Sequence, residues 1–490
     1  MTRSALHKAA KLSEAGFKVT IVTFRHRIDQ EEHIKSLRSS RRVHPSTEFI
    51  NFYDDLEQKM NDLVSSEQLT TIRVPDADLL VQKANNRLTR FFNADGSLAF
   101  TELISDNTKI PHKWRRFYDE DLNLLRLEEI TEAKNIFRVQ RYYPGRTEPS
   151  SRSMISSLGC AYITSWYDAH GVEKTVIDHT VSEESKQSAY KSTQELQSSW
   201  FKDLIQRYTN PVVLLDDPYV FNVVKLGLEL NPRNVLTVHN NTFTDPANEL
   251  SEINAEHFSL LKNANLFSKI VVSTNQQAED LRTVLKGREI QVIPQPVAPP
   301  PLNIKTKHSY QSLSFVGRLE PQKQILELVN HFPQVLDVYP EVTLNIYGQG
   351  SQREAIEETI SDLQLENNVF MHGQAVNVEE IFASSYLTLF PSKFEGFGLS
   401  LAESMLMRTP VVSFNCKYGP CEMIDSGING YLVPQGDFEA FNAQLIKCLE
   451  NPDEVEELRG PARNKIKKLC DPETIATAWE LLIKDVATSS

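Results

Sequence analysis

Short apolar runs alternate with helical patterns through the C-terminal half of the chain. Runs of strand-forming residues separated by apolar positions at helical spacing are typical of βαβ units, which build a parallel sheet. Between the first two runs, the segment QKQILELVNHFPQVLDVY at 322–339 has the spacing of a helix. The pattern predicts strands at 313–319, 342–348, 368–373, 387–392, 410–415 and 430–434.

A second series of apolar runs lies between residues 211 and 297, with PVVLL, NVLTVH, KIVVST and QVIPQPV as its strand-like segments. The proline cluster PQPVAPPPLN at 294–303 can continue neither a helix nor a central strand, so it predicts a linker. We therefore expect an α/β protein with two doubly wound domains. Their ligand should bind at the carboxyl ends of the strands.

Residues 46–200 carry a different pattern, in which aromatic pairs begin at positions 91, 117, 142 and 166. The spacing is close to 25 residues, and each pair is followed by Asp, Asn, Gly or Pro, the residues of tight turns. The pattern predicts four β-hairpins side by side in an antiparallel sheet. One face of this sheet either packs against another subunit or belongs to a self-contained accessory sheet, and the sequence leaves both open.

The first residues predict a helix that ends at Gly16, followed by a strand at 19–24. A doubly wound domain usually opens with a strand and a glycine-rich loop before such a helix, and this sequence shows neither. We therefore expect the first strand of the N-terminal domain to be missing, as in a truncated reading frame or an internal start codon.

Composition is that of an ordinary globular protein, with 40% hydrophobic and 24% charged residues among 490. We find no apolar run of the roughly 20 residues that span a bilayer, and no signal-peptide pattern. The five cysteines are few and irregularly spaced, which indicates reduced thiols. We expect a cytoplasmic protein, and peripheral association with the inner face of the membrane is left open.

The net charge of −13 argues against a general nucleic-acid binder. Residues 1–45 nevertheless hold ten Lys and Arg against four Asp and Glu. This basic segment is either a solvated surface or a landing patch for an anionic substrate. No metal site is expected: Cys416 and Cys421 lack a His pair at ligand spacing, and the acids of LLDDPY (214–219) are typical of caps and turns.

The segment FEGFGLSLAESM (394–405) places Glu395 in a glycine-spaced turn and Glu403 in a predicted helix. The N-terminus of that helix, near Gly398, Leu399 and Ser400, would present free N–H groups to a phosphate or a sugar hydroxyl. Glu403 lies one turn or more along the helix, where its carboxylate would accept two hydrogen bonds from a ribose diol.

Fixed positive charge comes from FVGRLEPQKQ, in which Arg318 follows a strand and Lys323 lies beyond the turn at Pro321. Two such cations can clamp a diphosphate and offset the charge of a leaving group. The Arg318–Lys323 pair and the Glu395–Glu403 pair are each weak evidence for a binding site. Their occurrence in this order, each after a strand of the same domain, is more specific.

Together with GINGYLV (427–433), these motifs resemble the retaining GT-B nucleotide-sugar glycosyltransferases of family 4. The resemblance is clearest over 205–485. The segment CKYGPCEMIDSGINGYLV (416–433) and the hairpin insertion resemble the wall teichoic acid poly(glycerol-phosphate) α-glucosyltransferases in particular. The resemblance implies an N-terminal acceptor-side domain at 1–45 and 205–298, an inserted β domain at 46–204, a nucleotide-sugar domain at 299–475, and a helix at 476–490 that packs back on the first domain.

The resemblance also implies roles for the matching residues. Arg318 and Lys323 would hold a UDP diphosphate, Glu403 the ribose, and Glu395 the donor sugar near the reacting carbon. The backbone of Gly398, Leu399 and Ser400 would face phosphate or sugar oxygens. His239, which ends a strand in LTVHNNTF, would touch the donor sugar, and Gly348 and Gly350 would shape a strand-end turn.

The expected activity is transfer of a hexose, with glucose as the expected sugar, from a UDP-sugar to hydroxyls of polyglycerol-phosphate, with retained configuration. It would need no metal, cofactor or protein nucleophile. Alternatives are an O-GlcNAc transferase for serine-rich surface proteins and a non-catalytic GT-B scaffold subunit. Expected partners are a UDP-sugar, a polyanionic teichoic acid acceptor and, through the β insertion, further copies of the chain, but not nucleic acid.

Overall fold

The chain divides into two compact units. The first contains Ala9–Thr209 and Val220–Asn231, and the second contains Thr2–Lys8, Asn210–Tyr219 and Pro232–Ser490. In the described residues no helix is both long and apolar enough to cross a membrane. The structure, a computed structural model, describes residues 3–26, 30–40, 42–64, 79–84, 87–95, 97–104, 113–131, 135–181, 188–244, 252–299 and 309–488.

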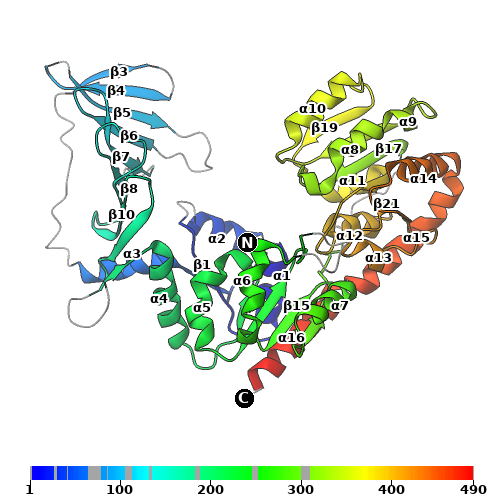
Figure 1. Cartoon of the computed structure of the whole chain (residues 1–490), viewed down its shortest axis with the longest axis horizontal. Helices are drawn as coiled ribbons and strands as arrows, with labels where there is room; N and C mark the ends of the chain where they lie inside the picture. Colours follow the sequence, from blue (N-terminus) through cyan, green and yellow to red (C-terminus); the bar gives the residue numbers. More distant parts are fainter. Residues whose placement is uncertain are drawn as a thin grey trace. The chain divides into compact units, whose positions relative to one another are not determined.

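The second unit contains a six-stranded parallel sheet, which confirms the six strands predicted from the C-terminal apolar runs. The chain starts in the middle of this sheet, moves to one edge and then returns to build the other half (Figure 1). Such a reversal of strand order marks the place where ligands bind in open α/β sheets. The spatial order is β19 (Val369–Gly373), β18 (Thr343–Tyr347), β17 (Ser309–Val316), β20 (Ser385–Phe390), β21 (Val411–Phe414) and β22 (Tyr431–Val433).

Helices cover both faces of this sheet. Consecutive strand residues point to opposite faces, and they fall into two separate core clusters: Leu389 and Val412 in one, Phe390 and Val411 in the other. Burial on both faces explains why the strands are continuously apolar. The helices around this sheet are α8 (Ile325–His331), α9 (Pro333–Leu336), α10 (Arg353–Asp362), α11 (Val378–Ser384), α12 (Leu399–Leu406), α13 (Pro420–Met423), α14 (Phe438–Glu450) and α15 (Pro452–Leu469). The terminal helix α16 (Pro472–Thr488) follows them in the chain.

Two sequence predictions in this region need correction. The strand predicted at 387–392 ends at Phe390, because Pro391 has no N–H to donate to a ladder. The helix predicted over 322–339 is divided into the 3₁₀ turn η4 (Pro321–Lys323), α8 and α9, with Pro333 at the first position of α9.

A four-stranded parallel sheet in the same unit confirms the second series of apolar runs. The linker residues 294–299 are neither helix nor strand, and 300–303 lie outside the described residues. The terminal helix α16 contacts this part of the unit through Lys269 and Asp485 (2.9 Å) and through Arg233, which donates to the carbonyl of Ala487 (3.2 Å). The elements are β13 (Val213–Leu215), β14 (Asn234–Val238), β15 (Lys269–Val272), β16 (Ile290–Val292), α6 (Ala255–Lys262) and α7 (Asn275–Val284).

The first unit begins in α1 (Arg3–Glu14), the predicted N-terminal helix, whose first residues belong to the second unit. Gly16 follows with φ +91°, as its predicted role at the helix end requires. The predicted strand is β1 (Thr20–Thr23), which pairs in parallel with β2 (Glu48–Asn51) as a separate two-stranded sheet. The other helices of this unit are α2 (Gln30–Ser39), α3 (Phe52–Leu63), α4 (Thr193–Gln206) and α5 (Phe221–Glu229).

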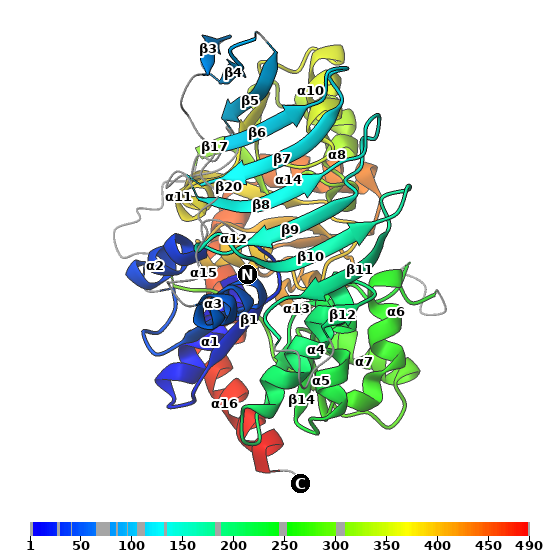
Figure 2. The same cartoon turned by 90° about the vertical axis from the view of Figure 1, so that its left-hand side faces the viewer.

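A ten-stranded antiparallel sheet makes up the rest of the first unit, and Figure 2 shows β3 and β12 at its opposite edges. Each strand pairs only with its neighbours in the chain. Three of the four aromatic pairs end β4, β6 and β10, and the fourth directly follows β8, so all four lie at turns, which confirms the four predicted hairpins. The strands are β3 (Leu80–Lys83), β4 (Leu88–Phe92), β5 (Leu98–Ile104), β6 (Lys113–Tyr118), β7 (Leu124–Ile130), β8 (Ile136–Arg141), β9 (Ser151–Ile155), β10 (Ala161–Tyr167), β11 (Glu173–Asp178) and β12 (Ala189–Tyr190).

Candidate functional site

Arg318 lies in a tight loop at the carboxyl end of β17. A Cβ atom added to Gly348 would stand 1.9 Å from the carbonyl oxygen of Gly317, and one on Gly350 would stand 2.3 Å from that of Leu319. Both contacts are with backbone, so neither position can carry a side chain without moving the loop. The predicted turn glycines therefore pack directly against the backbone on either side of Arg318, whose side chain is exposed.

Lys323 and Glu395, predicted from separate motifs, form one buried ion pair. Nζ of Lys323 lies 2.5 Å from Oε1 of Glu395, and the two residues are only 9% and 7% exposed. The ammonium also lies 5.2 Å from the ring centroid of Phe390, at the end of β20. Burial, followed by the charge of Glu395, raises the pKa of the neighbouring Cys416 thiol, which is therefore neutral. A lysine this close to a strand end is available to an anion once its carboxylate partner moves.

The loop that carries Glu395 approaches β14 closely. A Cβ atom on Gly396 would stand 1.7 Å from the carbonyl oxygen of His239, so only glycine fits. On its other side, Gln322 accepts from the amide of Lys393 (2.8 Å) and donates to the carbonyl of Phe394 (2.6 Å). The structure thus brings together the segments carrying Lys323, Glu395 and His239.

The helix predicted after this loop is α12, and it begins where the sequence places it. Gly398 precedes it with φ +92°, a left-handed conformation that favours glycine, and no side chain caps the helix. Leu399 is 41% exposed, while Ser400 and Glu403 are half-buried. The first N–H groups of α12 therefore belong to a terminus without a side-chain cap, as expected for a helix end that receives an anion.

His239 follows the last residue of β14, as predicted, but its ring faces protein groups. Its Nε2 lies 3.4 Å from Oδ1 of Asp216, an ion-pair distance, and its Nδ1 lies 3.3 Å from Nε2 of Gln295. Nζ of Lys8 contacts both oxygens of Asp216 at 2.7 and 3.0 Å and lies 3.9 Å from the ring centroid of Trp479. Desolvation opposes ionisation of Asp216, but the charge of Lys8 and the His239 ring hold its pKa far below the ordinary value.

Sequence reasoning missed Lys8, Asp216 and Gln295 as neighbours of His239. Of the two acids in LLDDPY, Asp217 does act in a turn, because it accepts from the amide of Tyr219 (3.0 Å), whereas Asp216 does not. The available signal was that Asp216 and His239 each follow a strand of one parallel sheet. Among the described residues, no group of three or more His, Cys, Asp or Glu could hold a metal ion.

The basic N-terminal segment is less cationic at its surface than its composition suggests. All four of its lysines are engaged with carboxylates, so the charge of the lysines, though not that of the six arginines, is neutralised locally. The pairs are Lys8 with Asp216, Lys11 with Glu14, Lys18 with Glu48, and Lys35 with Glu31.

A second cationic cluster, which sequence reasoning missed, lies on one face of the ten-stranded sheet. The register aligns Arg116, Gln140 and Arg152 in one row across β6 to β9. Arg138 lies on the same face and is held by Glu129 through contacts of 2.7 and 2.5 Å. Within the described part of the chain, the buried Nε of Arg152 has no hydrogen-bond partner. The sequence signal was the presence of arginine in each of the consecutive strands β6 to β9.

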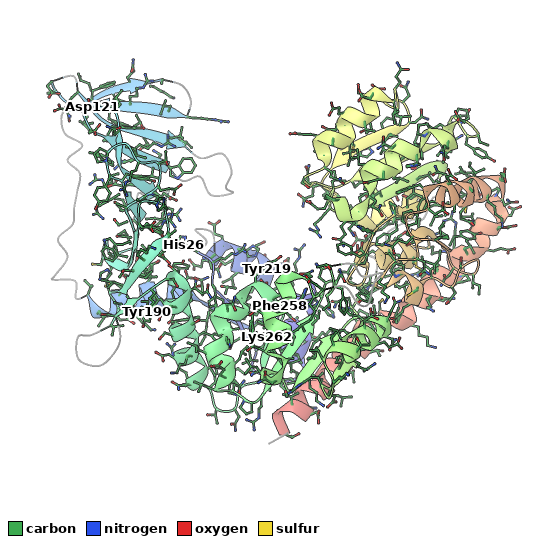
Figure 3. The ribbon with its side chains drawn as sticks, viewed as in Figure 1. His26, Asp121, Tyr190, Tyr219, Phe258 and Lys262 are labelled. Atoms are coloured by element: carbon green, nitrogen blue, oxygen red, sulfur yellow. The ribbon has the colours of Figure 1, made fainter. Side chains whose placement is uncertain are left out.

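His26, labelled in Figure 3, follows β1 in the same unit. Its ring stacks on Phe137 at 5.5 Å and meets the edge of Tyr53 at 5.4 Å. Burial, then the charge of Arg138, lowers the pKa of His26 to about 4, so the ring is neutral near pH 7.

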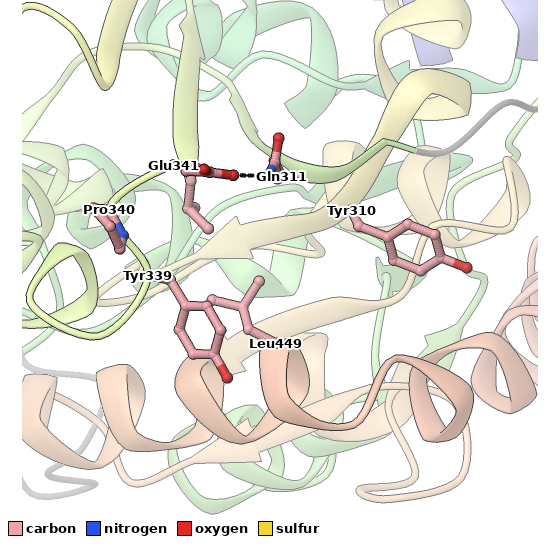
Figure 4. Close-up of a pocket in the computed structure, with 7 residues that line it drawn as sticks. Tyr310, Gln311, Tyr339, Pro340, Glu341 and Leu449 are labelled. Carbon is pink, nitrogen blue, oxygen red and sulfur yellow. Dashed lines mark hydrogen bonds between the residues drawn. The ribbon is translucent and has the colours of Figure 1, made fainter.

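A separate pocket of about 300 Å³ lies where β17 and β18 begin, at the opposite end of the sheet from Arg318 (Figure 4). Nε2 of Gln311 donates to Glu341 across it at 2.6 Å. None of the predicted site residues is among the described residues that line it. Those residues are Tyr310, Gln311, Tyr339, Pro340, Glu341, Val342 and Leu449.

Comparison with known proteins places these features in context. Residues 303–467 match the protein family described as "Glycosyl transferases group 1". The chain is 25% identical to a poly(glycerol-phosphate) alpha-glucosyltransferase of Bacillus subtilis, covering 97% of this chain and 71% of that protein. It is 24% identical to a poly(ribitol-phosphate) alpha-N-acetylglucosaminyltransferase of Staphylococcus aureus, covering 98% and 95%.

A third relative is the GtfA subunit of a UDP-N-acetylglucosamine–peptide N-acetylglucosaminyltransferase of Streptococcus agalactiae, 24% identical over 72% of this chain and 69% of that protein. Among solved structures, a TarM mutant of S. aureus in complex with Fondaparinux, alpha-GlcNAc-glycerol and UDP matches with a TM-score of 0.84. That match has 20% identity and covers 98% of this chain and 96% of the other, so it shows a shared fold over almost the whole chain.

Proposed function

We propose that this chain, a GT-B glycosyltransferase whose residues 303–467 form the glycosyl transferase group 1 domain, moves a hexose from a UDP-sugar to a polyglycerol-phosphate chain. The observation that carries the proposal is the buried Lys323–Glu395 pair, in the loops after β17 and β20, together with the start of α12, which no side chain caps. The curated relatives that glycosylate poly(glycerol-phosphate) and poly(ribitol-phosphate) support teichoic acid as the acceptor class.

Arg318 and Lys323 would bind the diphosphate. The exposed Arg318, which donates to Oε1 of Gln322 at 3.5 Å, would meet the first phosphate oxygens. Lys323 would exchange its contact with Glu395 for one with the phosphate as the donor enters. Two cations and an uncapped helix end can then stabilise the UDP leaving group without a metal. Glu395, released from Lys323, would accept a hydroxyl of the donor sugar, and Glu403 the ribose diol.

The chemical step follows from this charge distribution. As the bond between the anomeric carbon and the phosphate oxygen breaks, negative charge develops on the diphosphate. The acceptor hydroxyl attacks the same face of the sugar and passes its proton to that phosphate oxygen. The anomeric configuration is retained, and no protein nucleophile takes part. The backbone of Gly398, Leu399 and Ser400 would hold phosphate or sugar oxygens throughout.

His239 would contact the donor sugar in this proposal, as the sequence suggested. Gln295 contacts Nδ1 and Asp216 lies near Nε2, so both residues would orient the imidazole beside Gly396. Within the described residues Nε2 makes no hydrogen bond, so it is the ring nitrogen that would contact the sugar.

A polyanionic acceptor is supported by the arginine row of the ten-stranded sheet. Arg116 and Arg152 can contact phosphodiester groups, whereas the N-terminal lysines are largely paired with carboxylates. Assembly of copies through this sheet, and peripheral attachment to a membrane, remain predictions.

The test is release of UDP from UDP-glucose and UDP-N-acetylglucosamine with three acceptors: poly(glycerol-phosphate), poly(ribitol-phosphate) and a serine-rich peptide. We expect UDP-glucose with poly(glycerol-phosphate) to give the fastest release, with a rate that falls as salt rises because the acceptor is a polyanion. No release from any combination would favour the scaffold alternative.

The similarity to the GtfA subunit supports a second candidate function, which is transfer of N-acetylglucosamine to a serine-rich protein. That acceptor carries little charge, so the rate should depend only weakly on salt. Faster transfer to the peptide with a flat salt profile would replace the teichoic acid proposal with this one.

A further inference from the structure

Helix α7 carries a buried carboxylate that the proposed chemistry does not use. Asp280 is 5% exposed, and its two oxygens accept from Nζ of Lys417 at 3.1 and 2.9 Å. The hydroxyl of the fully buried Tyr418 donates to Oδ2 of Asp280 at 2.6 Å. Burying a carboxylate away from water costs free energy unless hydrogen-bond donors and positive charges compensate for the lost hydration. Asp280 therefore fixes two consecutive residues of the loop after β21.

These two residues hold the backbone of Glu395 from both sides. The amide of Glu395 donates to the carbonyl of Lys417 at 2.8 Å, and the amide of Tyr418 donates to the carbonyl of Glu395 at 2.8 Å. Both main-chain groups of Glu395 are thus bonded to the segment that Asp280 holds. The direction in which the Glu395 carboxylate leaves the backbone is set by this pairing.

Helix α7 is tied to the same loop at a second place. Glu422 accepts from the amide of Gln276 at 3.0 Å and from the side chain of Asn275 at 3.1 Å, at the first turn of α7. A carboxylate at a helix N-terminus is favourable, because it meets unpaired N–H groups and the positive end of the helix dipole. The contacts of Glu422 and those of Asp280 lie about one turn apart on α7. Together they hold the helix at one orientation about its axis, with Asp280 facing the loop.

We infer that Asp280 is a positioning residue for the donor sugar, acting from α7 through Lys417 and Tyr418 on Glu395. The inference rests on the proposed function, in which Glu395 contacts the sugar. The contacts end on Glu395, which would bind the sugar, and its partner Lys323 keeps its charge beside the diphosphate when Asp280 is replaced. Loss of Asp280 should therefore affect use of the whole UDP-sugar more than binding of UDP alone.

The experiment compares Asp280→Asn, Tyr418→Phe, Glu395→Gln and the Asp280→Asn/Glu395→Gln double variant. We expect Asp280→Asn to lower kcat/KM for the UDP-sugar about tenfold, since two charge-assisted hydrogen bonds weaken. The dissociation constant for UDP, measured by calorimetry, should change less than about twofold. Tyr418→Phe, which removes only one hydroxyl, should show the same split with a smaller loss.

The double variant separates a positioning role from a merely structural one. If Asp280 acts through Glu395, the double variant should be no worse than Glu395→Gln alone. Additive losses, an unchanged kcat/KM in Asp280→Asn, or an equal loss of UDP binding would each overturn the inference. If Asp280→Asn does not fold, Tyr418→Phe and its double variant with Glu395→Gln decide the question in the same way.

The matched control is Asp485→Asn, which breaks a different Asp–Lys contact of the same unit, with Lys269. It should leave both measurements unchanged. If Glu395→Gln itself leaves use of the sugar unchanged, the proposed function is wrong at that residue. If Glu395→Gln is impaired while Asp280→Asn is not, only the present inference fails.

Discussion

The six-stranded parallel sheet and the ten-stranded antiparallel sheet hold their residues in different ways. In the parallel sheet, both faces are covered by helices, and the loops at its carboxyl ends approach other backbone so closely that Gly348, Gly350 and Gly396 have no room for a Cβ atom. In the antiparallel sheet, most strands are only half-buried, and the interactions are between side chains of neighbouring strands.

The difference indicates that the parallel sheet holds the candidate site in a fixed geometry, whereas the antiparallel sheet tolerates substitutions on its surface. A site whose geometry is set by backbone contact tolerates little displacement, as transfer chemistry requires. A half-buried sheet with cross-strand pairs can exchange surface residues at small cost. The following predictions test this contrast, beginning with the parallel sheet.

Gly396→Ala should have the largest effect, because its Cβ atom would overlap the carbonyl of His239 at 1.7 Å. Displacing the Glu395 loop by about 1 Å should lower transfer activity about 100-fold or more. The control is Gly460→Ala in helix α15, where nothing lies within 4 Å of the added Cβ; it should stabilise the fold by about 0.5–1 kcal/mol. Full activity in Gly396→Ala would show that the backbone contact is not rigid.

Lys323→Ala should weaken UDP binding by about 30-fold, since a charge-assisted contact is worth about 1.5–3 kcal/mol. The substitution also leaves the buried Glu395 without its cation, so the melting temperature should fall as well. Calorimetric titration of UDP measures the first effect. Lys465→Ala, which removes a more exposed ion pair with Asp425, is the control and should bind UDP normally; unchanged affinity in Lys323→Ala would contradict the site assignment.

Phe100→Leu probes the antiparallel sheet, where Phe100 stacks on Phe91 at 4.4 Å and lies 5.3 Å from Phe117. Loss of these aromatic pairs should cost about 1–1.5 kcal/mol of unfolding free energy, measured by urea denaturation. UDP affinity should not change. Leu80→Ala, at a 62% exposed position of β3, should be nearly neutral; a loss of UDP binding in Phe100→Leu would show that the two sheets are not independent.

His26 should give the smallest effect near neutral pH, and one that grows as the pH falls. Because its pKa is lowered from 6.5 to about 4 in the fold, the neutral ring stabilises the native state above pH 6.5, and this contribution is lost as the pH falls from 6.5 toward 4. His26→Phe keeps the aromatic contacts and removes the titration. It should reduce the loss of stability over this range by up to about 3 kcal/mol.

Thermal melting at several pH values measures this difference. His170→Gln, in an exposed turn, serves as the control and should leave the pH profile as it is. A His26→Phe profile that matches the parent protein would show that other groups govern the acid response.

Much of the fold could be predicted because its signals are local. Strands buried on both faces appear as apolar runs, and aromatic pairs before turn residues mark the hairpins. Prolines changed the details: Pro391 ends β20 early, and Pro333 separates α8 from α9. Both effects follow from local chemistry and were available from the sequence.

The partners within the site could not be predicted in the same way. Lys323 and Glu395 are 72 residues apart, and each motif was assigned its own ligand, although in the structure they bind each other. Lys8 meets Asp216 across 208 residues, and Asp280 meets Tyr418 across 138. No periodicity encodes which charged groups meet after the chain folds, because that depends on the packing of whole elements.

The neighbour-to-neighbour order of the ten strands has a consequence for how this sheet can change over time. Among the described strands of this sheet, no hydrogen-bonded ladder joins strands that are distant in the chain, so each hairpin closes only a short loop. A hairpin could therefore be gained or lost as a module, in steps of two strands, without changing the registers of the others. The number of strands in this sheet would then vary among related chains, while the candidate site at the parallel sheet stayed the same.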